Sequence, residues 1–216
     1  MQTFSLPSHP TALIFDIDST LYTCPEYAHE QIDSQVRHFA EIRGMTADAA
    51  RALIADYRKK YAACHGGKRI SLGNLLTAFG ISIEESIAWR KQLFNPADYL
   101  HRDERLLATL TELSARFQLA CVTNNPVEPA RRTLAVLGVQ ALFPHVIGLD
   151  TCLKSKPARE PLELALQQMG VRTSQTISVG DRYDIDLALP LEMGMGGVLV
   201  SGVEEVYALP SVLGLR

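Results

Sequence analysis

Residues 12–21, ALIFDIDSTL, join a short apolar run to two carboxylates. The apolar part predicts a buried strand, and Asp16 and Asp18 follow where it ends. Burial disfavours charged carboxylates, and each repels the other unless a cation or hydrogen-bond donors compensate. Because α/β sheets bind ligands at the carboxyl ends of their strands, Asp16 is a candidate Mg²⁺ ligand, nucleophile or both. The alternative is a turn in which Asp18, Ser19 and Thr20 bond only to local backbone.

The composition is that of an ordinary globular protein. The chain has 216 residues, of which 47% are hydrophobic and 21% charged, and its net charge is -3. A chain of this size forms one domain or a core with a smaller inserted domain. Without a basic excess, nucleic acid is not expected as a partner, and a small ligand is favoured. The four cysteines are far apart and form no CxxC pair, which predicts reduced thiols rather than a zinc or redox site.

Targeting signals are not evident in the sequence. Residues 1–10 lack a basic region followed by a long apolar stretch, so no secretory signal is predicted. No apolar run approaches the ~20 residues needed to cross a membrane. We therefore expect a cytoplasmic protein that does not bind membranes.

The apolar pattern divides the chain into two parts. Residues 22–116 repeat apolar side chains at helical spacing, with almost no strand-like runs. From residue 117 onward, strand-like and helical segments alternate, as in a parallel sheet with crossover helices. We predict an α/β fold with a Rossmann-like core domain, residues 1–21 and 117–216, flanked by helices and interrupted by an all-helical cap domain, residues 22–116. Right-handed crossovers would bring the carboxyl ends of the core strands to one edge.

Two later segments place polar side chains near that edge. Thr123 and Asn124 follow a predicted strand and precede a helix, which suits either an anion site or an ordinary helix cap. Lys156 precedes Pro157 near another helix start. Its ammonium group could reach a phosphate or the carboxylate of Asp16, although solvated surface lysines are commoner.

A second apolar strand also ends in acids. Gly180 allows the backbone to approach a ligand closely, and Asp181 follows it directly. Asp181, with Asp184 or Asp186, offers oxygen ligands for a hard cation. Acids at a helix start explain Asp184 equally well, but they do not explain why a second buried strand ends in carboxylates.

Taken in order, these four elements resemble the signature of the haloacid dehalogenase-like (HAD) hydrolase superfamily, and the resemblance covers nearly the whole core. The helical block is similar to the cap of its phosphoglycolate phosphatase-like branch, and residues 15–22 and 95–100 resemble pyrimidine 5′-nucleotidases. Ser19 stands where many members have glycine. The resemblance implies a Mg²⁺-dependent phosphatase that hydrolyses a small phosphomonoester, either a nucleotide or a sugar phosphate. A phosphomutase on the same core and a catalytically silent phosphate-binding regulatory protein are the alternatives.

The resemblance also implies a role for each strand-end residue. Asp16 would be the nucleophile that forms an aspartyl-phosphate, and Asp18 would act as acid and base. Thr123 and Lys156 would hold the phosphoryl oxygens. Because dehalogenases of this superfamily need neither the metal nor this acid and base, Asp18 disfavours a dehalogenase.

A Mg²⁺ site is implied by the same resemblance. Its ligands would be the carboxylate of Asp16, the backbone carbonyl of Asp18 and the carboxylate of Asp181, with waters completing the octahedron. Asp186 would support this metal site by hydrogen bonding, with Asp184 as the alternative.

Substrate choice is expected to depend on residues beside the site and in the cap. Asn124 and Arg182 are candidates beside the site. Lys68 and Arg69 belong to the densest basic cluster of the cap, which suits a second anionic group on the substrate, although a solvated helix face is the alternative. The expected partner is a small phosphorylated metabolite, and the expected assembly is a monomer or homodimer.

Overall fold

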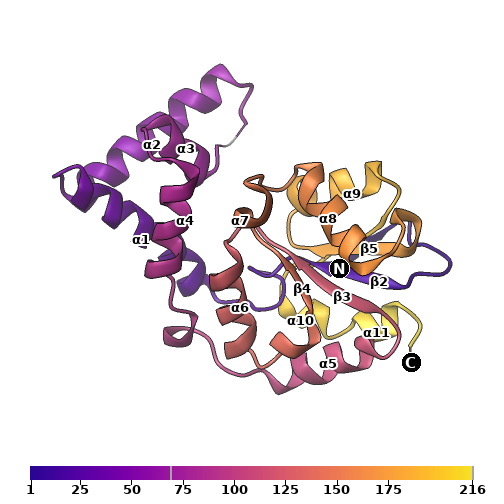
Figure 1. Cartoon of the computed structure of the whole chain (residues 1–216). Coiled ribbons are helices and arrows are strands. Elements are labelled where there is room, and N and C mark those ends of the chain that lie inside the picture. The colour runs from indigo at the N-terminus through magenta and orange to yellow at the C-terminus, as the bar shows by residue number, and fades with distance from the viewer. Residues whose placement is uncertain (69, 216) are drawn as a thin grey trace. The chain divides into compact units, whose positions relative to one another are not determined.

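A computed structural model describes residues 1–68 and 70–215, and the chain forms two compact units (Figure 1). The first unit comprises Met1–Pro25 and the chain from Asn95 onward, and the second is Glu26–Phe94. The first unit carries the strands β1 (Gln2–Phe4), β2 (Ala12–Phe15), β3 (Gln118–Val122), β4 (His145–Ile147), β5 (Thr176–Gly180) and β6 (Gly196–Leu199). Its α-helices are α5 (Glu104–Ser114), α6 (Val127–Val136), α7 (Leu149–Cys152), α8 (Arg159–Met169), α9 (Ala188–Glu192), α10 (Val203–Val206) and α11 (Leu209–Val212). Short 3₁₀ turns cover Pro96–Asp98, Gln140–Leu142 and Thr173–Gln175, and a π-helix, η4, covers Tyr183–Leu187.

The six strands form one sheet in the order β1-β6-β5-β2-β3-β4. All neighbours run parallel except β1, which pairs antiparallel with β6 at an edge. In β2, Phe15 pairs with Cys121 of β3 on one side and Val179 of β5 on the other. The three central strands therefore end together, and the residues that follow them meet at one edge. The predicted α/β class and parallel sheet are confirmed.

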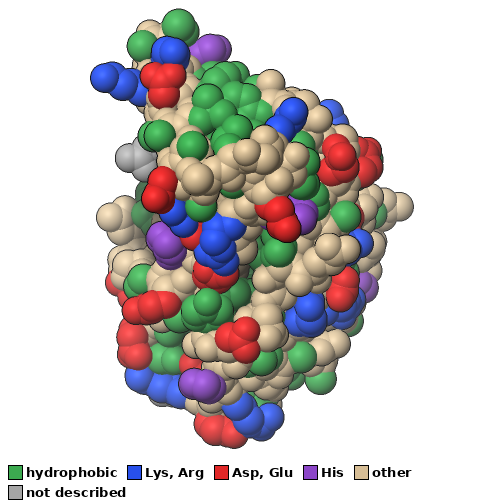
Figure 2. Space-filling view, turned by 90° about the vertical axis from the view of Figure 1, so that its left-hand side faces the viewer, with side chains coloured by type: hydrophobic (Ala, Val, Ile, Leu, Met, Phe, Trp, Pro, Cys, Tyr) green, Lys and Arg blue, Asp and Glu red, His purple; other side chains and the backbone are tan. Residues whose placement is uncertain are grey.

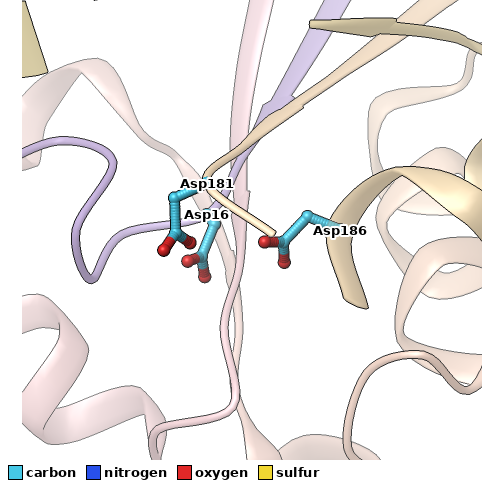
Figure 3. Close-up of side chains that lie close together, drawn as sticks. All are labelled: Asp16, Asp181 and Asp186. Atoms are coloured by element: carbon cyan, nitrogen blue, oxygen red, sulfur yellow. The ribbon is translucent and has the colours of Figure 1, made fainter. Parts of the chain in front are cut away.

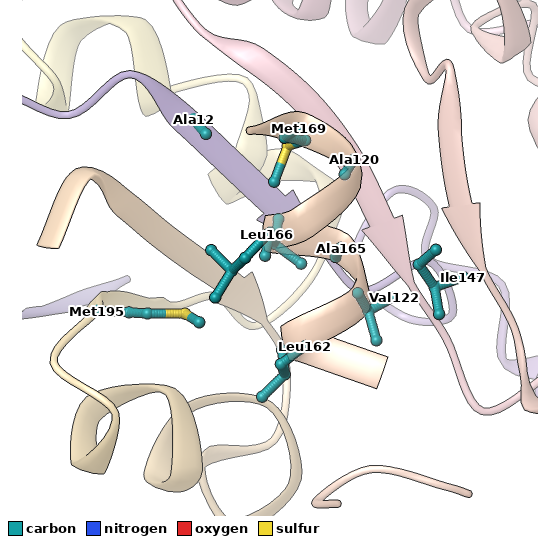
Figure 4. Close-up of a cluster of buried hydrophobic side chains, with 10 residues drawn as sticks. Ala12, Ala120, Val122, Ile147, Leu162, Ala165, Leu166, Met169 and Met195 are labelled. Carbon is teal, nitrogen blue, oxygen red and sulfur yellow. The ribbon is translucent and has the colours of Figure 1, made fainter. Parts of the chain in front are cut away.

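Helices cover both faces of this sheet, with α8 and α9 on one side and α5, α10 and α11 on the other (Figure 1). Alternate side chains of β2 enter different layers, because successive residues of a strand point to opposite faces. Ala12 and Ile14 pack with Leu162, Leu166 and other apolar side chains of α8 (Figure 4). Each such large apolar side chain, when fully buried, contributes about 1.5–3 kcal/mol.

The opposite layer receives the alternate residues of β2. Phe15 is fully buried there, and its ring meets that of Phe143 edge to face with the centroids 5.9 Å apart. Burial on both faces explains why residues 12–15 are continuously apolar rather than alternating.

Every secondary-structure element in the described part of the second unit is a helix, as predicted for the insertion. It consists of α1 (Pro25–Ile42), α2 (Ala47–Cys64), α3 (Leu72–Ala78) and α4 (Ile83–Leu93). The first residue of α1, Pro25, is the last residue before the boundary of this unit. Thr46, Ser71 and Ser82 cap the last three helices, each accepting a hydrogen bond from the backbone three residues on. Apolar side chains from all four helices build the core of this unit: Val36, Phe39, Ala40, Ala50, Ile54, Leu72, Leu75, Leu76, Ile81 and Trp89.

The predicted domain boundaries differ from this division. The chain leaves the first unit after Pro25 rather than after residue 21, and it returns at Asn95 rather than at residue 117. Residues 95–116 therefore belong to the first unit, where α5 contacts α10 and α11. The spacing of Leu106, Leu110 and Leu113 predicts a helix correctly, but helical periodicity does not reveal which hydrophobic core the apolar face joins.

The surface carries charges of both signs. On the face shown in Figure 2, lysine and arginine side chains are interspersed with aspartate and glutamate, as the net charge of -3 leads one to expect. Across the described residues, no helix has both the length and the apolar character that a membrane crossing requires.

A network of ion pairs joins α1 to α2 in the second unit. Asp33 of α1 accepts hydrogen bonds from Arg51 of α2, at 2.8 Å from Nε and 3.0 Å from Nη2, and also pairs with Arg37. The hydrogen bonds from Arg51 and, to a smaller extent, the hydrogen bond from Arg37 hold the pKa of the buried Asp33 carboxyl below its usual range. The carboxylate of Asp33 is therefore favoured in the folded state.

Asp33→Asn should lower the free energy of unfolding of this unit by about 1–2 kcal/mol at neutral pH, because bonds to charged groups contribute about 1.5–3 kcal/mol and the half-exposed arginines reduce this. The folded carboxyl has the lower pKa, so its contribution is complete above the ordinary value of 3.8 and is lost as the pH falls through the folded value. Urea denaturation followed by the fluorescence of Trp89, the single tryptophan, reports on this unit.

Asp48→Asn is the matched control. Asp48 also pairs with Arg51, at 2.7 Å, but its side chain is 92% exposed. This variant should lose less than about 0.5 kcal/mol. Equal losses in the two variants, or a loss in Asp33→Asn that persists well below pH 3.8, would contradict the account.

Candidate active site

Three acidic side chains converge at the carboxyl edge of the central strands. Asp16 directly follows β2, Asp181 directly follows β5, and Asp186 lies in η4. The carboxylates of these residues face one another (Figure 3). One carboxylate oxygen from each lies within 4.8 Å of the others. We call these three residues the acidic cluster.

Lys156 connects two members of the acidic cluster. Its Nζ lies 2.7 Å from Oδ1 of Asp16 and 2.7 Å from Oδ1 of Asp186. The side chains of all three residues are at most 5% exposed, so solvent screens these ion pairs little. Lys156 is separated from Asp16 by 140 residues in the sequence, yet it lies beside this strand-end carboxylate, which is one of the two partners expected for its ammonium group.

Burial and neighbouring charges shift the pKa values of the acidic cluster. Burial raises the pKa of Asp16 to about 7, opposed by the Lys156 ammonium and reinforced by Asp186 and Asp18. Burial and then the charge of Asp186 also raise the pKa of Asp181. Burial alone would lower the pKa of Lys156, but its two carboxylate partners raise it, so this side chain is a cation. One ammonium group therefore faces three carboxyl groups.

The acidic cluster suits a hard divalent cation. Oδ1 of Asp181 is buried and has no hydrogen-bond partner among the described residues. Arg182 Nε lies 3.9 Å from this atom, beyond hydrogen-bonding distance. An oxygen in this state needs a cation or a donor. Carboxylate oxygens are the ligands that Mg²⁺ prefers, so Asp16 and Asp181 fit the metal site expected from the sequence.

Asp186, rather than Asp184, is the acid that turns inward. Asp184 is exposed, whereas Asp186 is buried, and its Oδ2 accepts a hydrogen bond from the backbone N–H of Arg182 at 3.1 Å. The hydroxyl of Ser178 in β5 donates to the backbone carbonyl of Asp186 at 2.7 Å. With its carboxylate engaged by Lys156 and by backbone, Asp186 is suited to holding the lysine as much as to holding a metal.

Gly180 makes room for Asp186. A Cβ atom on Gly180 would lie 2.4 Å from Cβ of Asp186 and 2.6 Å from its Cγ, closer than such atoms approach. The sequence predicted that Gly180 lets the backbone approach a ligand. In the structure, the group that approaches it is the side chain of Asp186.

The carboxylate of Asp18 lies outside the acidic cluster and has its own donors. The hydroxyl of Tyr22 donates to Oδ1 at 2.5 Å, and the amide of Asn125 donates to Oδ2 at 2.9 Å. In the metal site that the resemblance implies, Asp18 contributes its backbone carbonyl, so that role does not use this carboxylate. Ser19, which follows, has a positive φ of 61°, the conformation that glycine adopts most easily, and it retains the turn.

Thr123 and Asn124 follow β3, and Asn124 contacts the segment that carries Lys156. Its side chain holds the main chain of Lys156, accepting from the N–H at 2.7 Å and donating to the carbonyl at 3.4 Å. Asn124 is therefore placed to position Lys156, and its expected contact with substrate stays a prediction. Thr123 Oγ1 accepts from the N–H of Asn125 at 3.1 Å, and its own proton remains available for another acceptor.

The sequence also allows an anion site at the start of α6. The N–H of Val127, the first residue of α6, donates to Oδ1 of Asp150 at 2.8 Å. This carboxylate occupies the position that a bound anion would take at that amide.

The other predicted substrate contacts lie on the surface. The Arg182 side chain is 52% exposed beside Asp181. Lys68 is exposed and belongs to the second unit, and Arg69 lies outside the described residues. Roles for these three side chains in substrate binding remain predictions.

Sequence reasoning missed three residues that organise the site: Tyr22, Asn125 and Asp150. Tyr22 lies four residues after Asp18, and Asn125 lies two residues after Thr123. Their positions next to polar strand ends were the available signal, but hydrogen bonds between distant loops depend on the fold.

Gly180→Ala should destabilise the first unit by at least about 2 kcal/mol, since the added methyl group forces Asp186 away from Lys156 and leaves buried charges unpaired. Urea denaturation followed by circular dichroism measures the loss. Gly73→Ala in α3 is the control, because its added Cβ would meet only the tip of the Arg90 side chain, at 3.1 Å. That control should be neutral or stabilising by up to about 1 kcal/mol, as alanine is favoured in helices. Wild-type stability in Gly180→Ala would contradict the close approach.

Comparison with known proteins agrees with this geometry. The chain is 26% identical over 174 residues to the pyrophosphatase PpaX of Bacillus velezensis, which covers 80% of this chain and 75% of that protein. It is 38% identical over 96 residues to a phosphoglycolate phosphatase of Rhodospirillum rubrum, covering 44% of this chain and 39% of that protein. A solved HAD phosphatase from Thermococcus onnurineus is similar in fold, with a TM-score of 0.64 and 20% identity over 94% of this chain and 98% of that one.

A protein family described as haloacid dehalogenase-like hydrolase matches residues 10–194. The matched region contains the acidic cluster, Lys156, Asp18 and the loops that hold them. This match covers most of the chain, so it confirms the resemblance drawn from the four strand-end elements and the expected hydrolase class. The chain belongs to the haloacid dehalogenase-like hydrolase family.

Proposed function

We propose that this protein is a Mg²⁺-dependent phosphatase that hydrolyses a small phosphomonoester through an aspartyl-phosphate on Asp16. The observation that carries the proposal is the arrangement of buried Asp16 and Lys156 with half-buried Asp181 at the sheet edge. It combines a carboxylate nucleophile, a fixed ammonium 2.7 Å from it, and a carboxylate oxygen with no hydrogen-bond partner among the described residues. A phosphate dianion can be attacked by a carboxylate only where positive charge offsets their repulsion.

In the first step, an oxygen of Asp16 forms a bond to phosphorus. The bond from phosphorus to the leaving oxygen breaks, and its electron pair stays with that oxygen. The carboxyl group of Asp18 gives its proton to the leaving oxygen, which departs as an alcohol. Lys156 and Thr123 hold the phosphoryl oxygens during the transfer.

In the second step, water attacks the phosphorus of the aspartyl-phosphate. Its proton passes to the Asp18 carboxylate, which the first step left ionised. The bond from phosphorus to Asp16 breaks, and the electron pair returns to the Asp16 carboxylate. Inorganic phosphate leaves, and both aspartates regain their starting protonation states.

Asp16 and Asp181, with the backbone carbonyl of Asp18, are the proposed ligands of Mg²⁺. When bound, the ion supplies positive charge that offsets the repulsion between the phosphate and Asp16. A cation at this carboxylate also favours its ionised form against the effect of burial. Asp186 completes the acidic cluster from the side of Lys156.

The relatives support a small phosphorylated substrate, since their names are phosphoglycolate phosphatase and pyrophosphatase. We propose a nucleotide or sugar phosphate, with Arg182 beside the site and Lys68 and Arg69 of the predicted cap as candidate contacts for further anionic groups.

Hydrolysis of p-nitrophenyl phosphate by the purified chain tests the proposed function. We expect turnover that requires Mg²⁺ and stops when the metal is chelated. Asp16→Asn should reduce kcat by at least about 10³-fold, because it removes the nucleophile at nearly constant volume. Folded wild-type protein without Mg²⁺-dependent turnover, or a folded Asp16→Asn variant with near wild-type activity, would refute the proposal.

Two carboxyl variants serve as controls for the metal site. Asp181→Asn removes a proposed ligand and should raise the Mg²⁺ concentration needed for half-maximal activity. Asp184→Asn makes the same change at an exposed acid outside the acidic cluster and should leave that concentration unchanged. Equal Mg²⁺ requirements in the two variants would count against Asp181 as a ligand.

A further inference from the structure

We propose that Tyr22 and Asn125 are positioning residues that aim the Asp18 carboxyl group at the leaving oxygen. This inference rests on the proposed phosphatase function, because it concerns the proton transfer assigned to Asp18. It adds two residues to the site that the sequence analysis did not identify.

Two side chains from different loops donate hydrogen bonds to the carboxyl group of Asp18. Tyr22, only 4% exposed, donates from its hydroxyl to Oδ1 at 2.5 Å, and Asn125 donates from Nδ2 to Oδ2 at 2.9 Å. A single donor would leave the carboxyl group free to rotate about that bond, whereas a donor on each oxygen fixes its plane.

The local backbone sets Tyr22 in place. After β2 the chain turns tightly, and the N–H groups of Thr20 and Leu21 donate to the carbonyl of Ile17 at 3.2 and 2.9 Å. Ser19, with its positive φ of 61°, lies within this turn. The turn brings Tyr22 back onto the carboxylate four residues earlier.

Asn125 is anchored independently. Its N–H donates to Oγ1 of Thr123 at 3.1 Å, and its carbonyl accepts from the N–H of Leu149 at 3.0 Å. Gly148 allows the second contact, because a Cβ there would lie 2.7 Å from the Asn125 carbonyl oxygen. A side chain on so fixed a backbone can hold its partner in one geometry, which is what a positioned proton donor needs.

Positioning has a consequence that a purely structural role lacks. A poor leaving group departs only if Asp18 protonates it, whereas a nitrophenolate departs without this help. Misplacing Asp18 should therefore slow the first step in proportion to the basicity of the leaving group. The second step is common to all substrates and also needs Asp18, so kcat for p-nitrophenyl phosphate should fall more than kcat/KM.

The experiment compares p-nitrophenyl, phenyl and benzyl phosphates, which are similar in shape but have increasingly basic leaving groups. For Tyr22→Phe and Asn125→Ala, we expect kcat/KM on benzyl phosphate to fall about 10- to 100-fold, since a positioned acid contributes about 10²–10⁴-fold. On p-nitrophenyl phosphate, kcat/KM should change less than about 3-fold, because the acid contributes little there.

Tyr207→Phe is the matched control. It also removes a tyrosine hydroxyl that donates to an aspartate in the first unit, Oδ2 of Asp103 at 2.5 Å, where α10 ends. It should leave the ratios of kcat/KM among the three esters at wild-type values. Asn125→Ala provides a second test of positioning that leaves the turn around Tyr22 intact.

The outcomes separate this inference from the proposed function. With Tyr22→Phe and Asn125→Ala, a gain in activity, or ratios of kcat/KM among the three esters that stay at wild-type values, would overturn the positioning role. Turnover by the wild-type protein would still uphold the phosphatase in that case. Wild-type protein that hydrolyses none of the esters would overturn both. A loss that grows with leaving-group basicity in both variants, and not in Tyr207→Phe, supports the positioning role.

Discussion

The paired contacts of the Lys156 ammonium with Asp16 and Asp186, both 2.7 Å, are the constraint on which the site depends. Burial at the end of a central strand raises the pKa of the Asp16 carboxyl, and the Lys156 ammonium opposes this shift and favours the carboxylate. The surrounding structure supports these contacts. The Asn124 side chain accepts a hydrogen bond from the main chain of Lys156, and the absence of a side chain at Gly180 leaves room for Asp186. Such an arrangement favours a ligand that brings both negative charge and a compensating cation.

Much of the fold could be predicted because continuous apolar runs and helical alternation are strong local signals. The run that ends at Phe15 identified the central strand, and its parallel neighbours followed from the rhythm after residue 117. Two features lacked such a signal. Strand β1 has three residues with no alternation, and α5 has the same periodicity as the cap helices although its apolar face joins the other unit.

The candidate site was predictable to the level of strand ends, because parallel strands bring their carboxyl ends to one edge whatever their separation in sequence. Side-chain partners were not predictable at that level. The contact of Asn124 with the main chain of Lys156 had no signal in the sequence, and only the π-helix after β5 shows that Asp186 rather than Asp184 turns inward. Tyr22 lies only four residues after Asp18, but its hydrogen bond to Asp18 depends on a turn geometry that spacing does not encode.

The central claim is that Asp16 is phosphorylated during turnover. The most direct measurement is mass spectrometry of peptides from acid-quenched Asp18→Asn protein after mixing with Mg²⁺ and p-nitrophenyl phosphate, since loss of the base lets the intermediate accumulate. We predict one phosphoryl group on Asp16, absent when Asp16→Asn is added to the same variant. A phosphoryl group on another residue, or none on protein that still releases p-nitrophenol, would contradict the account.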